Sequence, residues 1–305
     1  MSGYPPTSVI LPTVEWADAC AEVLDQLEPG DELLIICDNR SDPVYDRRDD
    51  LPVTARVIAA GEPEGCSGKA NAIATGMEAA GNDRIIWTDD DFHHPPDWLT
   101  TLNADYERHG PTSELPVFIG NDPLSYLVEP LYAYTGTGMV YAADVAWGGA
   151  LVFERDDVNG KALLRDLRRT VSDDGTLAEY VDFTAVKRTR RVEIGGTIRE
   201  SLERHVRFTK LVRHHDRDAM IAAAVVGTLV SVAYLLYPLA GLVLSTLCYG
   251  AVYAAFGIRR WTVLLSYPAT IAQVPLLAYA LARRTFVWGG RRYRWRSMFD
   301  VEVLE

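Results

Sequence analysis

Residues 85–92 read Ile-Ile-Trp-Thr-Asp-Asp-Asp-Phe, an apolar run that stops at three consecutive carboxylates. A short apolar run of this kind predicts a buried strand. Adjacent anions repel one another unless a cation gathers them, and the hard cations Mg²⁺ and Mn²⁺ prefer oxygen ligands that they share with substrate phosphates. The stretch therefore predicts a metal and phosphate site at a strand end. The alternative is a solvated, helix-capping turn. His93 and His94 are further candidate ligands of the metal, but we expect them to be exposed loop residues.

Strand and helix patterns alternate on both sides of this stretch. Apolar runs at residues 7–11, 33–37, 56–60, 84–88 and 117–120 predict strands, and helical spacing at residues 15–27, 69–80 and 97–108 predicts helices. Such alternation is typical of an α/β domain with a mostly parallel sheet covered by helices. Ligands bind beyond the carboxyl ends of such strands, which is where Asp38 and the Asp89 to Asp91 cluster fall.

Charge is distributed unevenly along the chain. The formal net charge is −12, yet residues 218–305 hold eight arginines and four acidic residues. The preceding part is therefore strongly acidic and repels phosphate backbones, which argues against nucleic acid as a partner. The four cysteines are far apart, so we expect them to be reduced and buried. The N-terminus has no basic start followed by an apolar run, so we expect no cleavable signal and a cytoplasmic N-terminal domain.

A membrane region follows the acidic part. Residues 219–258 contain no ionisable side chain apart from tyrosines and Cys248, a run of 40 residues where about 20 cross a bilayer, so two helices hinged near Tyr237 and Pro238 fit. A third apolar stretch, residues 261–282, contains Pro268 and Pro275 and has an arginine pair at each end. Positive charge prefers the cytoplasmic side, so this stretch either dips in and returns or forms a third, kinked span.

The basic segment before the membrane region, residues 187–217, has interleaved apolar residues and predicts an amphipathic helix on anionic lipid headgroups. Together these features predict a multi-pass protein of the cell membrane with its catalytic domain in the cytoplasm. The predicted parts are a catalytic domain at residues 1–198, an interfacial helix at 199–217, a membrane region at 218–283 and a basic cytoplasmic tail at 284–305.

Several motifs follow one another along the chain: Val9-Ile10-Leu11-Pro12-Thr13, the strand ending at Asp38, Gly68-Lys69-Ala70-Asn71, Asp89-x-Asp91, Trp147-Gly148-Gly149, Ser172-Asp173-Asp174, Arg204-x-x-Arg207-Phe208 and Trp288-Gly289-Gly290-Arg291-Arg292-Tyr293. In these motifs and their order the sequence resembles the family-2-type inverting glycosyltransferases of the GT-A fold, in particular the ceramide-glucosyltransferase-like membrane enzymes. Three positions depart from the family pattern: Asp173 replaces Glu, Phe208 replaces Trp and Gly289 replaces Arg.

The resemblance implies a nucleotide-sugar-binding, Rossmann-like domain and a role for each motif. Asp174 is the expected catalytic base, with Asp173 beside it, and Asp91 together with Asp89 is the expected ligand of Mn²⁺ or Mg²⁺. The alternatives are that the aspartate pair caps a helix, that Lys69 only begins a helix, that Trp147 is a core residue, and that the motif arginines contact lipid headgroups. The expected nucleotide-sugar-binding residues are Pro12, Asp38, Lys69, Asp89, Asp90, Trp147, Gly148, Gly149, Arg204, Arg207, Arg291 and Arg292.

The resemblance further implies transfer of a hexose from a nucleotide-sugar to a hydroxyl of a lipid or lipid-linked acceptor. A UDP-sugar is the expected donor, and membrane lipids are expected partners. A polyprenyl-phosphate sugar synthase is the main alternative, but a phosphate acceptor is already ionised and has no use for the base that Asp173 and Asp174 supply. A processive polysaccharide synthase needs more membrane helices than this chain offers. A non-catalytic membrane scaffold with the same fold is the alternative outside enzymes.

Overall fold

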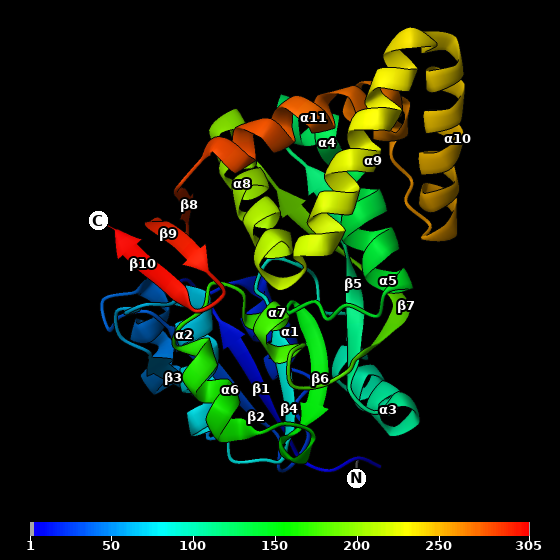
Figure 1. Cartoon of the computed structure of the whole chain (residues 1–305). Coiled ribbons are helices and arrows are strands. Elements are labelled where there is room, and N and C mark those ends of the chain that lie inside the picture. The colour runs from blue at the N-terminus through cyan, green and yellow to red at the C-terminus, as the bar shows by residue number, and fades with distance from the viewer. Residues whose placement is uncertain (1–2, 305) are drawn as a thin grey trace. The chain divides into compact units, whose positions relative to one another are not determined.

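The computed structural model describes residues 3–304 (Figure 1), and these divide into two compact units. The first unit comprises residues 3–115, 143–190 and 298–303, and the second comprises residues 116–142, 191–297 and 304. Each unit is thus built from segments that are distant in the sequence.

Seven strands form one sheet: β1 (Thr7–Pro12), β2 (Glu32–Cys37), β3 (Ala55–Ala59), β4 (Arg84–Thr88), β5 (Thr112–Gly120), β6 (Ala150–Glu154) and β7 (Thr184–Ile194). Their order is β3-β2-β1-β4-β6-β5-β7, with β5 and β7 continuing into the second unit. The first four strands in that order are parallel, whereas β6 is antiparallel to β4 and β5. The predicted α/β class with a mostly parallel sheet is confirmed, and all five predicted strands form.

The other elements of the first unit are α1 (Asp18–Leu24), η1 (Pro43–Asp50), α2 (Gly68–Ala79), α3 (Trp98–His109), η3 (Arg155–Asp157), α6 (Gly160–Leu167), α7 (Asp173–Leu177) and β10 (Asp300–Leu304). Helices α2 and α3 agree with their predicted ranges to within one residue. Helix α1 is shorter than predicted because the chain turns at both ends, where Ala17 N donates to Glu15 O and Leu27 N donates to Leu24 O. The core includes Ile10, Ile73 and Trp87, all fully buried.

The second unit is mainly helical. Its elements are α4 (Pro123–Tyr132), the π-helical turn η2 (Ala133–Met139), α5 (Val140–Ala142), α8 (Ile198–His215), α9 (Arg217–Leu236), α10 (Pro238–Ala255), η4 (Trp261–Leu265), α11 (Ser266–Ala282) and the hairpin of β8 (Phe286–Trp288) and β9 (Arg291–Ser297). The prediction of one amphipathic helix from residue 187 is wrong, because β7 occupies residues up to Ile194. Gly195 and Gly196, with φ of 90° and 118°, end the strand, and a capping box of Thr197 and Glu200 starts α8.

Among residues 3–304, three helical segments are long and apolar enough to cross a membrane, and all lie in the second unit: Arg217–Leu236, Pro238–Ala255 and Trp261–Ala282. The first two meet at the predicted hinge, and they expose large apolar side chains such as Leu229, Leu239 and Leu247. Cys248 is also exposed on α10, so the expectation that all four cysteines are buried is wrong for it. Helix α11 runs on through Pro275 and packs against α4, α8 and α9 (Figure 1).

A buried carboxylate ties α4 to the connection between α10 and η4. Glu129 is 1% exposed and accepts hydrogen bonds from Arg260 Nε and Nη2, both at 2.9 Å. It also accepts from Thr262 Oγ1 at 2.5 Å and from Gly120 N at 3.0 Å. The charge of Glu129 is thereby paired and hydrogen-bonded, as a buried charge requires.

Candidate active site

The parallel strands of the first unit deliver three predicted residues to one edge of the sheet. Pro12 is the last residue of β1, Asp38 follows β2, and Asp89 follows β4. The carboxyl ends of these strands share an edge because β1 is parallel to both neighbours. In open α/β sheets this is the edge at which ligands bind. The geometry thus places the carboxylate-rich turn where the sequence pattern indicated a site.

Lys69 joins two carboxylates that come from different elements. Its Nζ lies 2.5 Å from Asp89 Oδ1 and 3.3 Å from Asp173 Oδ2. Lys69 is in the first turn of α2, and Asp173 is in the first turn of α7. The side chains of Lys69 and Asp173 are only 17% and 4% exposed, so solvent screens these contacts weakly. Lys69 therefore does more than begin a helix: it brings the Asp89 turn and the aspartate pair together.

Burial governs the pKa values in this cluster. It raises the pKa of Asp89 to about 6 and that of Asp173 to about 6, although the ammonium of Lys69 opposes both shifts. Burial alone would lower the pKa of Lys69, but Asp173, Asp89 and Asp174 raise it above its ordinary value. One ammonium thus serves several carboxylates at neutral pH. The cluster is short of positive charge, which a bound cation would supply.

Asp174 is held by the start of α7. Ser172 is the N-cap residue, and its hydroxyl donates to Asp174 Oδ1 at 2.7 Å. Gly175 N donates to the same oxygen at 2.7 Å, and Gly148 N donates to Asp174 Oδ2 at 3.2 Å. The cap of the helix is therefore Ser172 and not the aspartate pair. Because a carboxylate offers about four acceptor positions, Oδ2 retains capacity for a further donor such as a substrate hydroxyl.

Two glycines allow the Trp147-Gly148-Gly149 loop to pass close to these carboxylates. A Cβ on Gly148 would lie 2.8 Å from Asp173 Oδ2, and one on Gly149 would lie 2.2 Å from the Trp147 ring. Gly149 O accepts the backbone N–H of Asp89 at 3.1 Å. Trp147 is half-buried, with its ring centre 5.4 Å from that of Phe92. The loop is thus fixed against Asp89 on one side and the aspartate pair on the other.

The described residues, 3–304, contain no group of three His, Cys, Asp or Glu side chains that could hold a metal ion by themselves. The predicted ligands are Asp89, which contacts Lys69, and Asp91, which is exposed. Asp90 between them is half-buried. Mg²⁺ is commonly bound by one or two carboxylates and completed by substrate phosphates and water. Asp89 and Asp91 therefore fit a cation that is shared with a diphosphate.

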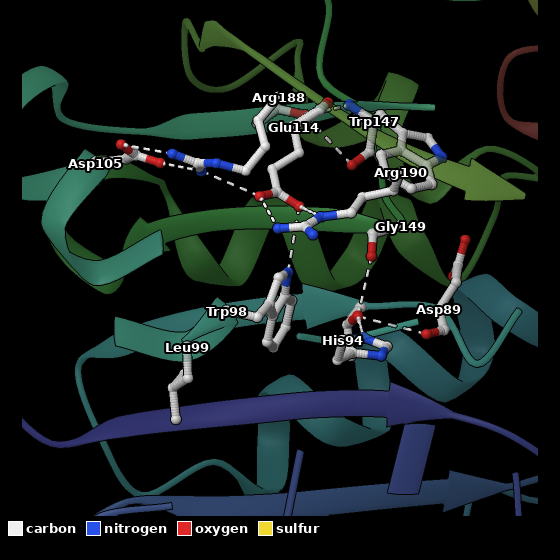
Figure 2. Close-up of polar contacts among 12 residues, drawn as sticks. Asp89, His94, Trp98, Leu99, Asp105, Glu114, Trp147, Gly149, Arg188 and Arg190 are labelled. Carbon is white, nitrogen blue, oxygen red and sulfur yellow. Dashed lines mark hydrogen bonds and ion pairs between the residues drawn. The ribbon is translucent and has the colours of Figure 1, made fainter. Parts of the chain in front are cut away.

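The expectation that both histidines after this turn are exposed is wrong for His94. Its side chain is buried, whereas His93 is exposed and pairs with Glu22 at 2.6 Å. His94 lies in a row of side chains that leads from Asp89 to Trp98 and Glu114 (Figure 2). Sequence reasoning missed this residue because a single histidine in a polar turn carries no burial signal. The neighbouring aromatic residues at 92 and 98 were the only hint.

The predicted arginines of α8 lie in the second unit. Arg204 and Arg207 both line a pocket of about 490 Å³ together with Trp288 and the glycines of the β8–β9 turn. Arg207 Cζ lies 4.0 Å from the centre of the Trp288 ring, a distance that suits a cation–π contact. Two motifs that are distant in the sequence thus meet in one site. Phe208 packs with Phe118 instead, at 5.6 Å between ring centres.

Arg291 and Arg292 are half-buried residues of β9, directly after the β8–β9 turn. The turn itself is formed by Gly289 and Gly290, with φ of 55° and 76°, values that favour glycine. The donor-binding roles of these arginines and of the other predicted residues stay predictions, as do the catalytic role of Asp173 and Asp174 and the metal-binding role of Asp89 and Asp91.

Comparison with known proteins agrees with the resemblance. Residues 8–147 match the family model described as glycosyl transferase family 2. The resemblance to this family is thereby confirmed over that segment, whereas the narrower likeness to ceramide-glucosyltransferase-like enzymes stays a prediction. The sequence has no significant match among curated proteins.

Solved structures similar to this chain include two enzymes named as phosphoglycerate glycosyl synthases. A glucosyl-3-phosphoglycerate synthase from Mycobacterium tuberculosis, in complex with Mn²⁺, UDP-glucose and phosphoglyceric acid, has a TM-score of 0.43 and 15% identity over 68% of this chain and 79% of that chain. A mannosyl-3-phosphoglycerate synthase from Rubrobacter xylanophilus has a TM-score of 0.45 and 14% identity over 71% of this chain and 76% of that chain.

Proposed function

We propose that this chain is a membrane-anchored, inverting glycosyltransferase that transfers a hexose from a nucleotide-sugar to a hydroxyl of a lipid or lipid-linked acceptor. The proposed donor is a UDP-sugar. The observation that carries the proposal is the cluster in which Lys69 connects Asp89 to Asp173, with Asp174 beside them. The family-2 match over residues 8–147 supports the reaction class.

Asp174 is the proposed catalytic base. As the acceptor oxygen forms its bond to the anomeric carbon, the bond from that carbon to the diphosphate breaks, and the hydroxyl proton passes to Asp174 Oδ2. General-base help of this kind typically contributes about 10² to 10⁴ in rate. Ser172 and Gly175 hold the other oxygen of Asp174, so the carboxylate is oriented before the acceptor arrives. Asp173 and Lys69 set the charge around it.

Asp91 and Asp89 are the proposed ligands of Mn²⁺ or Mg²⁺, and a bound cation would stabilise the negative charge that develops on the leaving diphosphate. Asp38 and Pro12, at the same sheet edge, are proposed to contact the nucleoside. Asp90 is proposed to contact the ribose or the sugar of the donor. Trp147 and the glycines after it are proposed to border the acceptor side.

The membrane part of the proposal rests on α9, α10 and α11, which are long and apolar enough to cross a bilayer. Helix α11 packs along α4 and α8 rather than only along the apolar hairpin, which supports a helix that returns to its own side. An even number of crossings would keep both ends of this region on the cytoplasmic side. Arg204 and Arg207 would then meet the donor diphosphate there, with Arg291 and Arg292 near them.

The decisive experiment is an assay of the full chain in detergent or nanodiscs, with a panel of UDP- and GDP-sugars and extracted lipids, and with the product identified by mass spectrometry. We expect a glycosylated neutral or hydroxyl-bearing lipid from the parent. Asp174→Asn should bind UDP as the parent does and lose transfer about 10²-fold or more, because the amide cannot accept the proton. Asp156→Asn, which removes an exposed carboxylate away from the cluster, is the matched control.

The other outcomes separate the alternatives. A labelled polyprenyl phosphate would identify the main rival reaction, and a long polysaccharide would identify a processive synthase. Failure of the parent to transfer or hydrolyse any nucleotide-sugar would favour a non-catalytic scaffold. Equal loss of UDP binding and turnover in Asp174→Asn would assign that residue a structural role.

A further inference from the structure

His94 occupies a position that a purely apolar side chain would fill at lower cost. Its side chain is buried between aromatic rings, with ring centres 4.1 Å from Phe92 and 4.5 Å from Trp98. The Nδ1 atom is buried without a hydrogen bond and lies 3.5 Å from a carboxylate oxygen of Glu22. A buried polar atom without a hydrogen bond destabilises a fold. Packing alone therefore does not account for a histidine here.

The other ring nitrogen makes a short contact with Thr88. His94 Nε2 lies 2.7 Å from Thr88 Oγ1, and that hydroxyl donates to Gly149 O at 3.0 Å. A second carbonyl, that of Asp89, lies 3.4 Å from the same hydroxyl. A hydroxyl has one hydrogen, and when Thr88 donates it to Gly149 O, the imidazole is the donor in its contact with Thr88. The proton of the neutral ring then resides on Nε2.

Burial favours this neutral form. It lowers the pKa of His94 to about 4, although Glu22 acts in the opposite direction. The charged groups that face the ring are Glu22 on α1, His93 beside it and Arg190 on β7. Glu22 is already engaged by the backbone N–H of His94 at 2.7 Å and by His93 Nδ1 at 2.6 Å. Glu22 therefore needs no proton from the His94 ring, and a neutral imidazole agrees with all the contacts described.

The contact reaches the proposed reaction centre through one carbonyl oxygen. Gly149 O accepts both the Thr88 hydroxyl and the backbone N–H of Asp89, and the residue before it, Gly148, donates to Asp174. The imidazole thus determines which way the Thr88 hydroxyl points. Through that hydroxyl it holds the loop that separates Asp89 from Asp174.

An ion cluster around the buried Glu114 holds Trp98, whose ring packs against that of His94 (Figure 2). Trp98 Nε1 donates to Glu114 Oε2 at 3.3 Å, and Arg190 donates to both oxygens of Glu114 at 2.5 and 2.7 Å. Arg188 adds a contact with Glu114 at 3.1 Å. Glu114 is fully buried, so its position and that of Trp98 are fixed. Trp98, which packs against His94, is therefore held by a hydrogen bond to a charged group as well as by packing.

We propose that His94 is a positioning residue: as a neutral imidazole protonated on Nε2, it directs the Thr88 hydroxyl to Gly149 O and so fixes the distance between the Asp89 turn and the base Asp174. This inference rests on the proposed function for its kinetic consequence. The tautomer and the hydrogen-bond pattern do not depend on it.

The kinetic test compares three variants of the full chain. His94→Phe keeps the aromatic packing and removes the donor, Thr88→Val keeps the shape and removes the hydroxyl, and His94→Gln keeps an N–H donor. We expect the first two to lower kcat about 10- to 100-fold with little change in donor KM, because small misplacements at a reaction centre are costly. The double variant should be no worse than either single one, and His94→Gln should recover most of the rate.

The spectroscopic test needs no activity. ¹⁵N spectra of histidine-labelled protein, with His94→Phe to assign the signal, should report a neutral ring protonated on Nε2 at pH 7. A ring protonated on Nδ1, or a charged ring, overturns the proposal, as does a Thr88→Val variant with the parent's kcat. If the parent transfers no sugar, the proposed function fails while the spectra still decide the tautomer. If His94→Phe does not fold, Thr88→Val decides the kinetic part and His94→Gln assigns the His94 signal in the spectra.

Discussion

Replacing Lys69 with methionine removes the ammonium and keeps most of the side-chain volume. Its Nζ lies 2.5 Å from Asp89 and 3.3 Å from Asp173, and at an effective dielectric constant of about 20 charges about 3 Å apart attract by roughly 5 kcal/mol. Removing one partner of a buried pair typically costs about 3 to 5 kcal/mol. The carboxylates can escape part of that cost by taking up protons, since their pKa values are about 6. We therefore expect a loss near the lower bound, about 3 kcal/mol at pH 7.5.

The expected loss depends on pH in a defined direction. Asp173 has a folded pKa of about 6, above its ordinary value of 3.8, so the stability that it contributes is present at low pH and falls as pH rises through about 6. Without Lys69 the folded pKa rises further, and the fall extends to higher pH. The difference between parent and variant should therefore be large at pH 7.5 and small at pH 5.5.

Melting curves in detergent at the two pH values measure this. At about 2 to 4 °C per kcal/mol for a domain of this size, Lys69→Met should lower Tm by roughly 6 to 12 °C at pH 7.5. The double variant Lys69→Met, Asp173→Asn should recover a large part of it, and Lys161→Met, an exposed lysine of α6, should change little. A variant that melts within 2 °C of the parent at pH 7.5, or whose deficit is as large at pH 5.5, would refute the account of the cluster.

Three further predictions follow from the site and the membrane helices. Asp91→Ala should lose the effect of Mn²⁺ on UDP affinity, measured by calorimetry with and without chelator; a parent-like metal dependence would contradict the ligand assignment. Gly149→Ala should lower stability by about 1 to 3 kcal/mol through the clash of its Cβ with Trp147, seen as a lower Tm, and an unchanged Tm would count against it. In a Cys248→Ser background, the thiol of Ser297→Cys in sealed vesicles should react with a membrane-impermeant thiol reagent on the cytoplasmic side. Labelling only from the other side would contradict the proposed topology.

Much of the first unit was predictable because its strands and helices have clear local sequence patterns. Strands β1 to β4 are short and have apolar residues at their centres, and β4 is buried at every position. The turn at residues 89–91 could be recognised in the sequence because three adjacent carboxylates repel one another and destabilise the fold unless a cation binds them. Parallel pairing then places strand ends together, so the proximity of Asp38 and Asp89 to one sheet edge followed from the pattern.

The contacts that complete the site were not predictable from local pattern. The meeting of Lys69 with Asp173 depends on how α7 packs beside α2, and these residues are more than one hundred positions apart. The burial of His94 depends on Glu22 of α1 and Trp98 of α3 as well as on its neighbour Phe92. The strand at residues 184–194 was mistaken for a helix because its many arginines resemble a membrane-surface pattern, whereas two glycines with positive φ decide where the helix begins.

The tie between Glu129 and Arg260 has a consequence for biosynthesis. The two residues are 131 positions apart, so Glu129 leaves the ribosome long before its guanidinium partner exists. The ribosome synthesises α9 and α10 between these two residues. If both helices enter the bilayer as a hairpin, Arg260 emerges on the same side of the membrane as α4. A nascent chain that stops before residue 260 lacks the guanidinium and leaves Glu129 with only the hydrogen bond from Gly120 N among these contacts. A buried carboxylate without its charged partner destabilises a fold, so we expect α4 to pack stably only after Arg260 has been made.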